Sequence, residues 1–153
     1  MRWIVLSVLS LVLVQVASAQ LNPGDDSKFI EDVNYSDYST VKPGEKITKK
    51  WKIKNTGSVE WKGRYLSRIG DLNEGFKSEK WISIKDTKPG QDCILEVPMT
   101  APTKVGGPYK AEFKMVELRG VDKKGGKVVK VKEEVFLFPN KIAVFILVYV
   151  KEW

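Results

Sequence analysis

Carboxylates are the side chains of this sequence with the widest possible chemistry, because it contains no histidine and a single cysteine, Cys93. Without histidine the chain lacks the commonest general base, and the nucleophile–histidine pairs of many hydrolases cannot form. A pair of carboxylates could still hydrolyse a glycosidic bond. The candidates stand on predicted loops or outward-facing strand positions: Glu60, Glu79, Asp86, Glu112 and Glu117. The sequence places no two of them in one cleft, so we expect no enzymatic activity.

Cys93 does not change this expectation. One thiol combined with carboxylates is a poor set of zinc ligands, so the sequence predicts no metal site and no cofactor. Cys93 alternates with Leu95, Val97 and Met99, which is the pattern of one face of a strand. We therefore interpret it as a small buried side chain rather than a reactive thiol.

Two features could instead bind a partner. Trp81 faces away from Ile82, and an exposed tryptophan at this position could stack on a sugar or a peptide. A tryptophan held within the fold is the favoured alternative. The second feature is a lysine-rich outer strand face, formed by Lys46, Lys50, Lys52 and Lys54. Such a face could attract an anionic polymer, but a solvated face that prevents aggregation is the favoured interpretation.

The basic charge of the chain is mostly lysine. The formal net charge is +7, from 26 basic and 19 acidic residues. The only arginines are Arg2, Arg64, Arg68 and Arg119. Sequence-specific nucleic-acid contacts favour the planar arginine side chain, so we expect no specific nucleic-acid partner. A protein partner is expected, with a glycan or an anionic polymer as the alternative.

The segment from residue 43 to residue 61 gives the strongest signal for the fold. The segment begins with a Pro-Gly turn. Ile47, Trp51 and Ile53 then share one face of the predicted strand, with Lys49 as the single polar member of that face. An Asn-Thr-Gly turn follows, and then Trp61. Apolar residues at period two between turns predict a strand with one face in a core.

Similar patterns recur along the chain at intervals of about 8–12 residues, with no helical period, which is typical of an all-β sandwich. The predicted strands cover residues 28–33, 45–54, 60–66, 80–84, 91–99, 109–118 and 141–150, with an inserted hairpin near 121–136. Residues 67–78 are predicted to be a polar loop. Residues 143–150 are apolar at every position, which predicts a last strand buried on both faces.

Residues 1–19 have the pattern of a signal peptide. Arg2 precedes an apolar run, and Ala17-Ser18-Ala19 matches a small-residue cleavage site that leaves Gln20 as the new N-terminus. We therefore expect a secreted or periplasmic protein with no transmembrane segment after cleavage. An uncleaved anchor helix is the alternative, which the short apolar run disfavours. Residues 20–27 form a polar lead-in to a domain at residues 28–150.

The order of motifs resembles a known family. It runs through the 43–57 strand and turn, Trp61, Pro89-Gly90, Ala101-Pro102 and Gly107-Pro108-Tyr109. This order resembles the immunoglobulin-like four-tryptophan (FW) domain, which is the central domain of the next-to-breast-cancer-one autophagy receptors and has exported bacterial relatives. The resemblance covers residues 28–150.

The resemblance implies an immunoglobulin-like antiparallel β-sandwich of about 7–9 strands that acts as a non-catalytic binding or assembly module through protein–protein contacts. Trp51 and Trp61 match two of the four tryptophans of the family, Phe113 takes the third position, and an aliphatic residue takes the fourth. Trp81 lies outside the pattern. The expected structural core is Ile47, Trp51, Ile53, Trp61, Leu95, Val97, Tyr109 and Phe113.

Overall fold

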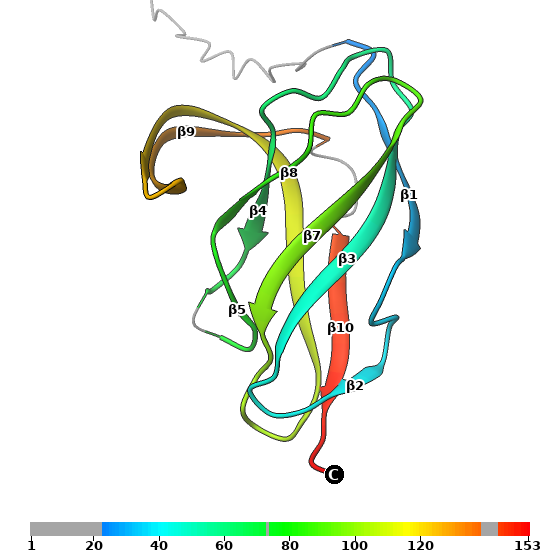
Figure 1. Cartoon of the computed structure of the whole chain (residues 1–153), viewed down its shortest axis with the longest axis vertical. Helices are drawn as coiled ribbons and strands as arrows, with labels where there is room; N and C mark the ends of the chain where they lie inside the picture. The colour runs from blue at the N-terminus through cyan, green and yellow to red at the C-terminus, as the bar shows by residue number, and fades with distance from the viewer. Residues whose placement is uncertain (1–22, 73, 139–143) are drawn as a thin grey trace, which may run out of the picture.

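The computed structural model describes residues 23–72, 74–138 and 144–153, and these residues contain strands but no helix (Figure 1). The strands are β1 (Ser27–Asp32), β2 (Ser39–Val41), β3 (Lys46–Asn55), β4 (Tyr65–Ile69), β5 (Lys77–Ser78), β6 (Trp81–Ser83), β7 (Asp92–Thr100), β8 (Gly106–Lys124), β9 (Lys127–Phe136) and β10 (Val144–Val150). The predicted signal peptide, residues 1–19, lies outside the described residues. Within the described ranges, no helix is long and apolar enough to cross a membrane.

The strands form two sheets that pack face to face (Figure 1). One sheet has the order β1-β3-β7-β5, and the other has the order β2-β10-β8-β4-β6, with β9 paired to β8. The predicted all-β, immunoglobulin-like sandwich is confirmed. The described residues contain ten strands rather than seven to nine, because the short β2 and β5 carry no clear sequence pattern. β2 also runs parallel to β10, whereas the prediction was antiparallel throughout.

β3 is an inner strand, between β1 and β7, and its side chains alternate between buried and more exposed positions, so one of its faces lies in the core. Ile47, Trp51 and Ile53 point into the core, and β3 pairs with β7 from Lys46 to Lys54. A register shift of one residue would turn every one of these side chains to the opposite face. The hydrophobic pattern therefore fixes the pairing as well as the strand.

Trp51 and Phe113 join the two sheets at the centre of the core. Their ring centroids are 5.8 Å apart, and Trp51 Nε1 donates a hydrogen bond of 2.8 Å to the carbonyl oxygen of Phe145. Tyr109, expected in the core, is half-buried against it. The other expected core residues are all buried: Ile47, Trp51, Ile53, Trp61, Leu95, Val97 and Phe113.

The predicted strand at residues 60–66 is wrong over its first half. β4 begins at Tyr65, and Trp61 stands before it in an isolated bridge to Thr87. Both backbone hydrogen bonds of this bridge measure 2.9 Å. Trp61 is nevertheless fully buried. The prediction from its large apolar side chain was therefore right about its burial and wrong about its secondary structure.

The predicted polar loop at residues 67–78 is wrong at both ends, where β4 and β5 form. Ser67 and Arg68 suggested a loop because they are polar, but both are buried. The Arg68 guanidinium donates to the carbonyl oxygen of Phe76 at 3.0 Å and to Ser78 Oγ at 3.2 Å. Its long side chain therefore reaches acceptors inside the fold, although its Nε has no hydrogen-bond partner among the described residues. The sequence pattern shows only a polar residue at this position.

The predicted burial of the last strand on both faces is wrong for one face. Ile146, Val148 and Val150 of β10 are buried, and the residues that alternate with them are half-exposed. Residues 141–143 of the predicted strand lie outside the described residues. An apolar run therefore did not distinguish a strand between two layers from one at the surface of a sandwich.

Cys93 is buried on the core face of β7, and this burial raises the pKa of its thiol, although Thr87 and Lys85 oppose the shift. We expect a thiol-reactive dye at mildly alkaline pH to label the native protein much more slowly than the urea-unfolded chain. Because the folded-state pKa is the higher one, the free energy of unfolding should fall as the pH rises past about 8.5. Equal labelling rates in the two states would contradict the burial.

Candidate functional site

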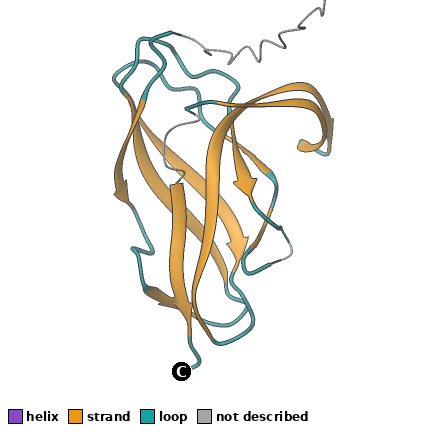
Figure 2. Cartoon of the chain, turned by 180° about the vertical axis from the view of Figure 1, so that it is seen from behind, coloured by secondary structure: helices purple, strands orange, loops and turns teal. Residues whose placement is uncertain are grey.

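The β8–β9 hairpin, residues 117–136, extends from the sandwich as a curled arm (Figure 2). β8 is 19 residues long. It pairs with β10 over residues 106–113 and with β9 over residues 116–124. Val116 pairs with both β4 and β9, so β9 and β10 follow one another along the same edge of β8. Beyond Val116, the two hairpin strands form backbone pairs only with each other among the described strands.

Gly120 lies within β8 at a position where the hairpin can bend. Its φ is +62°, a left-handed conformation that residues with a Cβ rarely adopt. A Cβ on Gly120 would approach the Lys132 side chain to 2.6 Å. Past this bend the hairpin tip contacts the region next to β6, where Lys127 Nζ lies 2.6 Å from a Glu79 carboxylate oxygen.

We expect Gly120→Ala to destabilise the hairpin by at least about 1 kcal/mol more than Gly125→Ala, because it adds a steric clash. Gly125 is a matched control, since its φ is +59° and a Cβ there meets nothing within 4 Å. Amide hydrogen exchange of β8 and β9 measures the difference, because a hairpin can open without unfolding the sandwich. Equal exchange in the two variants would exclude Gly120 as the origin of the curl.

A cleft of about 250 Å³ lies between the hairpin tip and the edge strand β6. We call it the hairpin cleft; its lining includes Tyr65, Glu79, Trp81, Lys123, Lys127 and Val128. Lys123 Nζ lies 5.9 Å from the ring centroid of Tyr65. Aromatic rings beside charges of both signs suit the binding of a polar chain.

The structure places Trp81 in the hairpin cleft, where it is half-buried. It pairs with Ser67 of β4 on the outer face of the sheet, whereas Ile82 packs against the core. Trp81 Nε1 donates to a Glu134 carboxylate oxygen at 3.3 Å. Trp81 is therefore neither a free surface ring nor a core residue, because the hairpin covers part of it.

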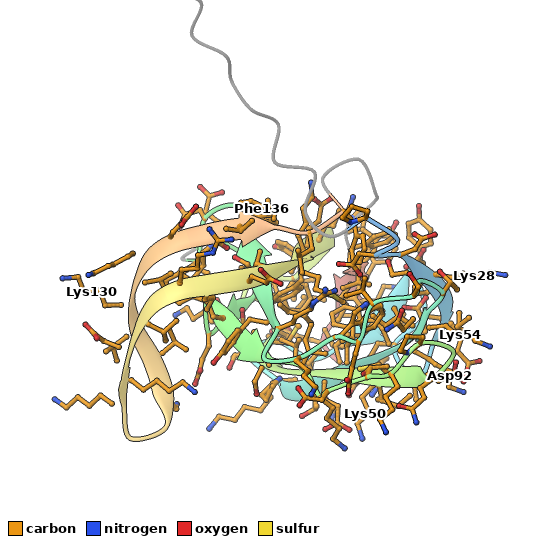
Figure 3. All side chains as sticks on the ribbon, turned by 90° about the horizontal axis from the view of Figure 1, so that it is seen from above. Lys28, Lys50, Lys54, Asp92, Lys130 and Phe136 are labelled. Atoms are coloured by element: carbon orange, nitrogen blue, oxygen red, sulfur yellow. The ribbon has the colours of Figure 1, made fainter. Side chains whose placement is uncertain are left out.

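The lysine face of β3 is not a uniformly positive surface. Its members are Lys46, Lys50, Lys52 and Lys54. Lys50 pairs with Glu96 at 3.3 Å and Lys52 with Glu31 at 3.0 Å, and the hydrogen bond to Glu31 raises the pKa of Lys52. Lys54 stands opposite Asp92 on β7, at the same side of the molecule (Figure 3). Acidic side chains from both neighbouring strands therefore interrupt the positive charge of this face.

A second group of lysines lies on the hairpin, which projects away from the lysine face of β3 (Figure 3), and one acid, Asp122, stands opposite Lys130 on the neighbouring strand. Between residues 123 and 132 the sequence has five lysines and no acid: Lys123, Lys124, Lys127, Lys130 and Lys132. Lys127 is paired with Glu79. Lys124, Lys130 and Lys132 are exposed and form no ion pair with the residues that the structure describes. The alternation of valine and lysine in residues 127–135 was the sequence signal for this surface.

The sequence analysis also did not predict how cations are held inside the fold. Lys49 is fully buried; its Nζ lies 2.7 Å from an Asp32 carboxylate oxygen and also donates to the carbonyl oxygens of Asn34 and Tyr35. Arg64 is buried as well. Lys49 has three acceptors within the fold, and the terminal nitrogens of Arg64 bind Asp25, although Arg64 Nε has no hydrogen-bond partner among the described residues. We therefore assign both side chains structural roles. Among the described residues, no three possible metal-binding side chains gather at one point.

Asp25 holds Arg64 in place from the polar lead-in. The Arg64 guanidinium donates to both carboxylate oxygens of Asp25, at 3.1 and 2.7 Å, and Trp61 Nε1 donates to the first of them at 3.2 Å. Both charged side chains are nearly inaccessible, with exposed fractions of 2% and 3%. The lead-in therefore contributes to the core, so the compact fold begins before the expected domain boundary at residue 28.

Comparison with known proteins identifies a family. A family model described as "Ig-like domain from next to BRCA1 gene" matches residues 34–132. Protein JOKA2 from Solanum tuberosum is 36% identical over 87 residues, which cover 55% of this chain and 10% of JOKA2. Protein ILRUN from Danio rerio is 29% identical over 94 residues, which cover 61% of this chain and 32% of ILRUN.

Next to BRCA1 gene 1 protein from Rattus norvegicus is 28% identical over 108 residues, which cover 69% of this chain and 11% of that protein. The chain thus spans between 10% and 32% of the length of these three relatives. The family model covers well over half of the chain and includes β3, Trp51 and Trp61. The chain therefore belongs to the family described as the Ig-like domain from next to BRCA1 gene.

Proposed function

We propose that this chain is a non-catalytic module that binds another protein. The match to the family of Ig-like domains over residues 34–132 carries the proposal, because related domains in the autophagy receptors act as docking modules. The arrangement of charges supports it. The buried ions hold the core together, and the exposed lysines and the hairpin cleft offer contacts rather than a reacting group.

A pull-down with the chain from Gln20 to Trp153 as bait tests this function. We expect a discrete protein to be captured at low salt and to be retained at least in part at high salt, because salt screens exposed charges but not apolar contacts or backbone hydrogen bonds. The same preparation should show no turnover on a broad panel of hydrolase substrates. Reproducible turnover that a single carboxylate substitution abolishes would overturn the proposal.

We also propose that the chain is exported. The charge, apolar run and small-residue site of residues 1–19 support this. Expression of the full chain in a bacterium, followed by fractionation and intact mass measurement, tests it. The expected product is an extracytoplasmic chain that begins at Gln20. A bulky substitution at Ala19 should block cleavage, and a full-length chain in the cytoplasm would contradict export.

A glycan or an anionic polymer is the alternative ligand. The two aromatic rings of the hairpin cleft, Tyr65 and Trp81, favour it over other non-protein ligands. In this case Trp81→Ala should abolish binding on a glycan array, and Lys50→Glu with Lys52→Glu should abolish binding to an anionic polymer. Binding that is unchanged in both variants would exclude this alternative.

A further inference from the structure

We propose that the open edge of β9 binds an extended acidic segment of a partner protein as an added strand. This inference rests on the proposed protein-binding function and names the surface and the chemistry of the partner. β9 is ten residues long and pairs only with β8 among the described strands. An edge strand exposes unpaired backbone N–H and C=O groups, and these can pair with another chain.

The location of the hairpin keeps this edge accessible. Past Val116, β8 and β9 leave the body of the sandwich (Figures 2 and 3). Val129 has an exposed fraction of 58%, and Phe136 has one of 37%. Val129 also lies at a register shift, where Lys123 pairs with Val128 and Asp122 with Lys130. A strand with an exposed valine and an exposed phenylalanine at an open edge is a surface on which a second strand can lie.

The charges on β9 determine which kind of partner strand can bind there. Lys130 and Lys132 are two residues apart, so they project from the same face of β9, and neither has an ion pair among the described residues. Val131 projects from the opposite face. A strand added beside β9 places its side chains next to these, and opposite charges on neighbouring strands attract. The partner segment should therefore alternate acidic and apolar residues.

The two lysines favour an acidic strand over a basic one at this edge, because opposite charges on neighbouring strands attract and like charges repel.

A labelled peptide of alternating glutamate and valine, matched in length to the ten residues of β9, tests the inference by fluorescence anisotropy. We expect saturable binding to the native chain and none for the lysine–valine peptide. Lys130→Glu with Lys132→Glu should weaken binding by about tenfold or more. The matched control, Lys46→Glu with Lys54→Glu, changes the net charge equally and should leave binding within about twofold.

Backbone methylation of the peptide separates strand addition from simple attraction of charge, and it leaves the protein unaltered. Alternate residues of a strand direct their N–H groups to the same edge. One peptide is N-methylated at its glutamates and another at its valines. We expect one of the two to lose binding and the other to retain it.

Equal affinity of both methylated peptides, or equal loss in the two charge-reversed variants, would overturn the strand-addition inference and leave a non-specific attraction for polyanions. The inference would also fail if a partner captured in the pull-down binds the Lys130→Glu, Lys132→Glu variant as well as the native chain. The proposed binding function would survive that result. Absence of any captured protein would instead remove the proposed function, whatever the peptide does.

Discussion

Replacing Trp51 with alanine lowers the expected free energy of unfolding by about 3–5 kcal/mol, the range for removal of a large core aromatic. Trp51 has no exposed surface. Its ring contacts Phe113 across the core and lies under the Lys49 ammonium group, 5.4 Å from the ring centroid. The substitution leaves a cavity between the sheets and also orphans the carbonyl oxygen of Phe145, which accepts the Trp51 hydrogen bond.

Urea unfolding followed by circular dichroism measures this loss, and Trp153→Ala is the matched control. Trp153 has an exposed fraction of 78%, so its removal should change the free energy of unfolding by less than about 0.5 kcal/mol. Trp51→Phe retains most of the apolar volume but loses the hydrogen bond to Phe145, and it should fall between the two. A loss below about 1 kcal/mol for Trp51→Ala would mean that the sheets do not close over this side chain.

The sequence was sufficient to predict the strands whose side chains alternate. Apolar residues recur at every second position of β7, and at every second position of β3 from Ile47 to Ile53 except Lys49; the structure pairs the two strands in the register that buries both sets. A half-buried strand imposes this period directly on its sequence. The hairpin was predictable for a related reason, since Gly125 and Gly126 form a turn that precedes a run of valines and charged residues at 127–135.

Period two placed Lys49 on the core face of its strand, but the partners of the buried cations were not predictable, and polarity suggested a loop for Arg68. Lys49, Arg64 and Arg68 are all buried. Each bonds to a group distant in sequence or to carbonyl oxygens, although the Nε atoms of the two arginines have no partner among the described residues. Asp32, for example, is 17 residues from Lys49. Only the tertiary structure brings such partners together. Arg68 shows the electrostatic consequence, since burial lowers the pKa of its guanidinium against the opposing effect of Asp71.

The candidate site was predictable only in part, for a geometric reason. The parity of Trp81 and Ile82 indicated which of the two leaves the core, but not that the hairpin covers the tryptophan. That cover depends on the bend in β8, and a glycine in a sequence does not reveal the sign of its φ. Likewise, four lysines on one strand suggested a positive face. The acids that pair with Lys50 and Lys52 come from other strands, so the sequence of this strand does not show them.

The pair formed by Asp25 and Arg64 provides the second large effect. We expect Asp25→Ala to destabilise the fold by about 3–5 kcal/mol, because it leaves the buried guanidinium without a counter-ion. Trp61 Nε1 loses its acceptor in the same variant. Urea unfolding measures the change, with Asp37→Ala as the control. Asp37 is exposed, so its replacement should have an effect below about 0.5 kcal/mol.

A second substitution separates the charge from the packing. Asp25→Ala combined with Arg64→Met removes the orphaned charge and retains an apolar side chain of similar length, so it should be less destabilising than Asp25→Ala alone. A chain that begins at Lys28, the boundary expected from the sequence, should lose as much stability as Asp25→Ala, whereas one that begins at Gln20 should not. If the double variant is as unstable as the single one, the lead-in stabilises the domain through the backbone contact of Gly24 with Ser58 and not through the buried ion pair.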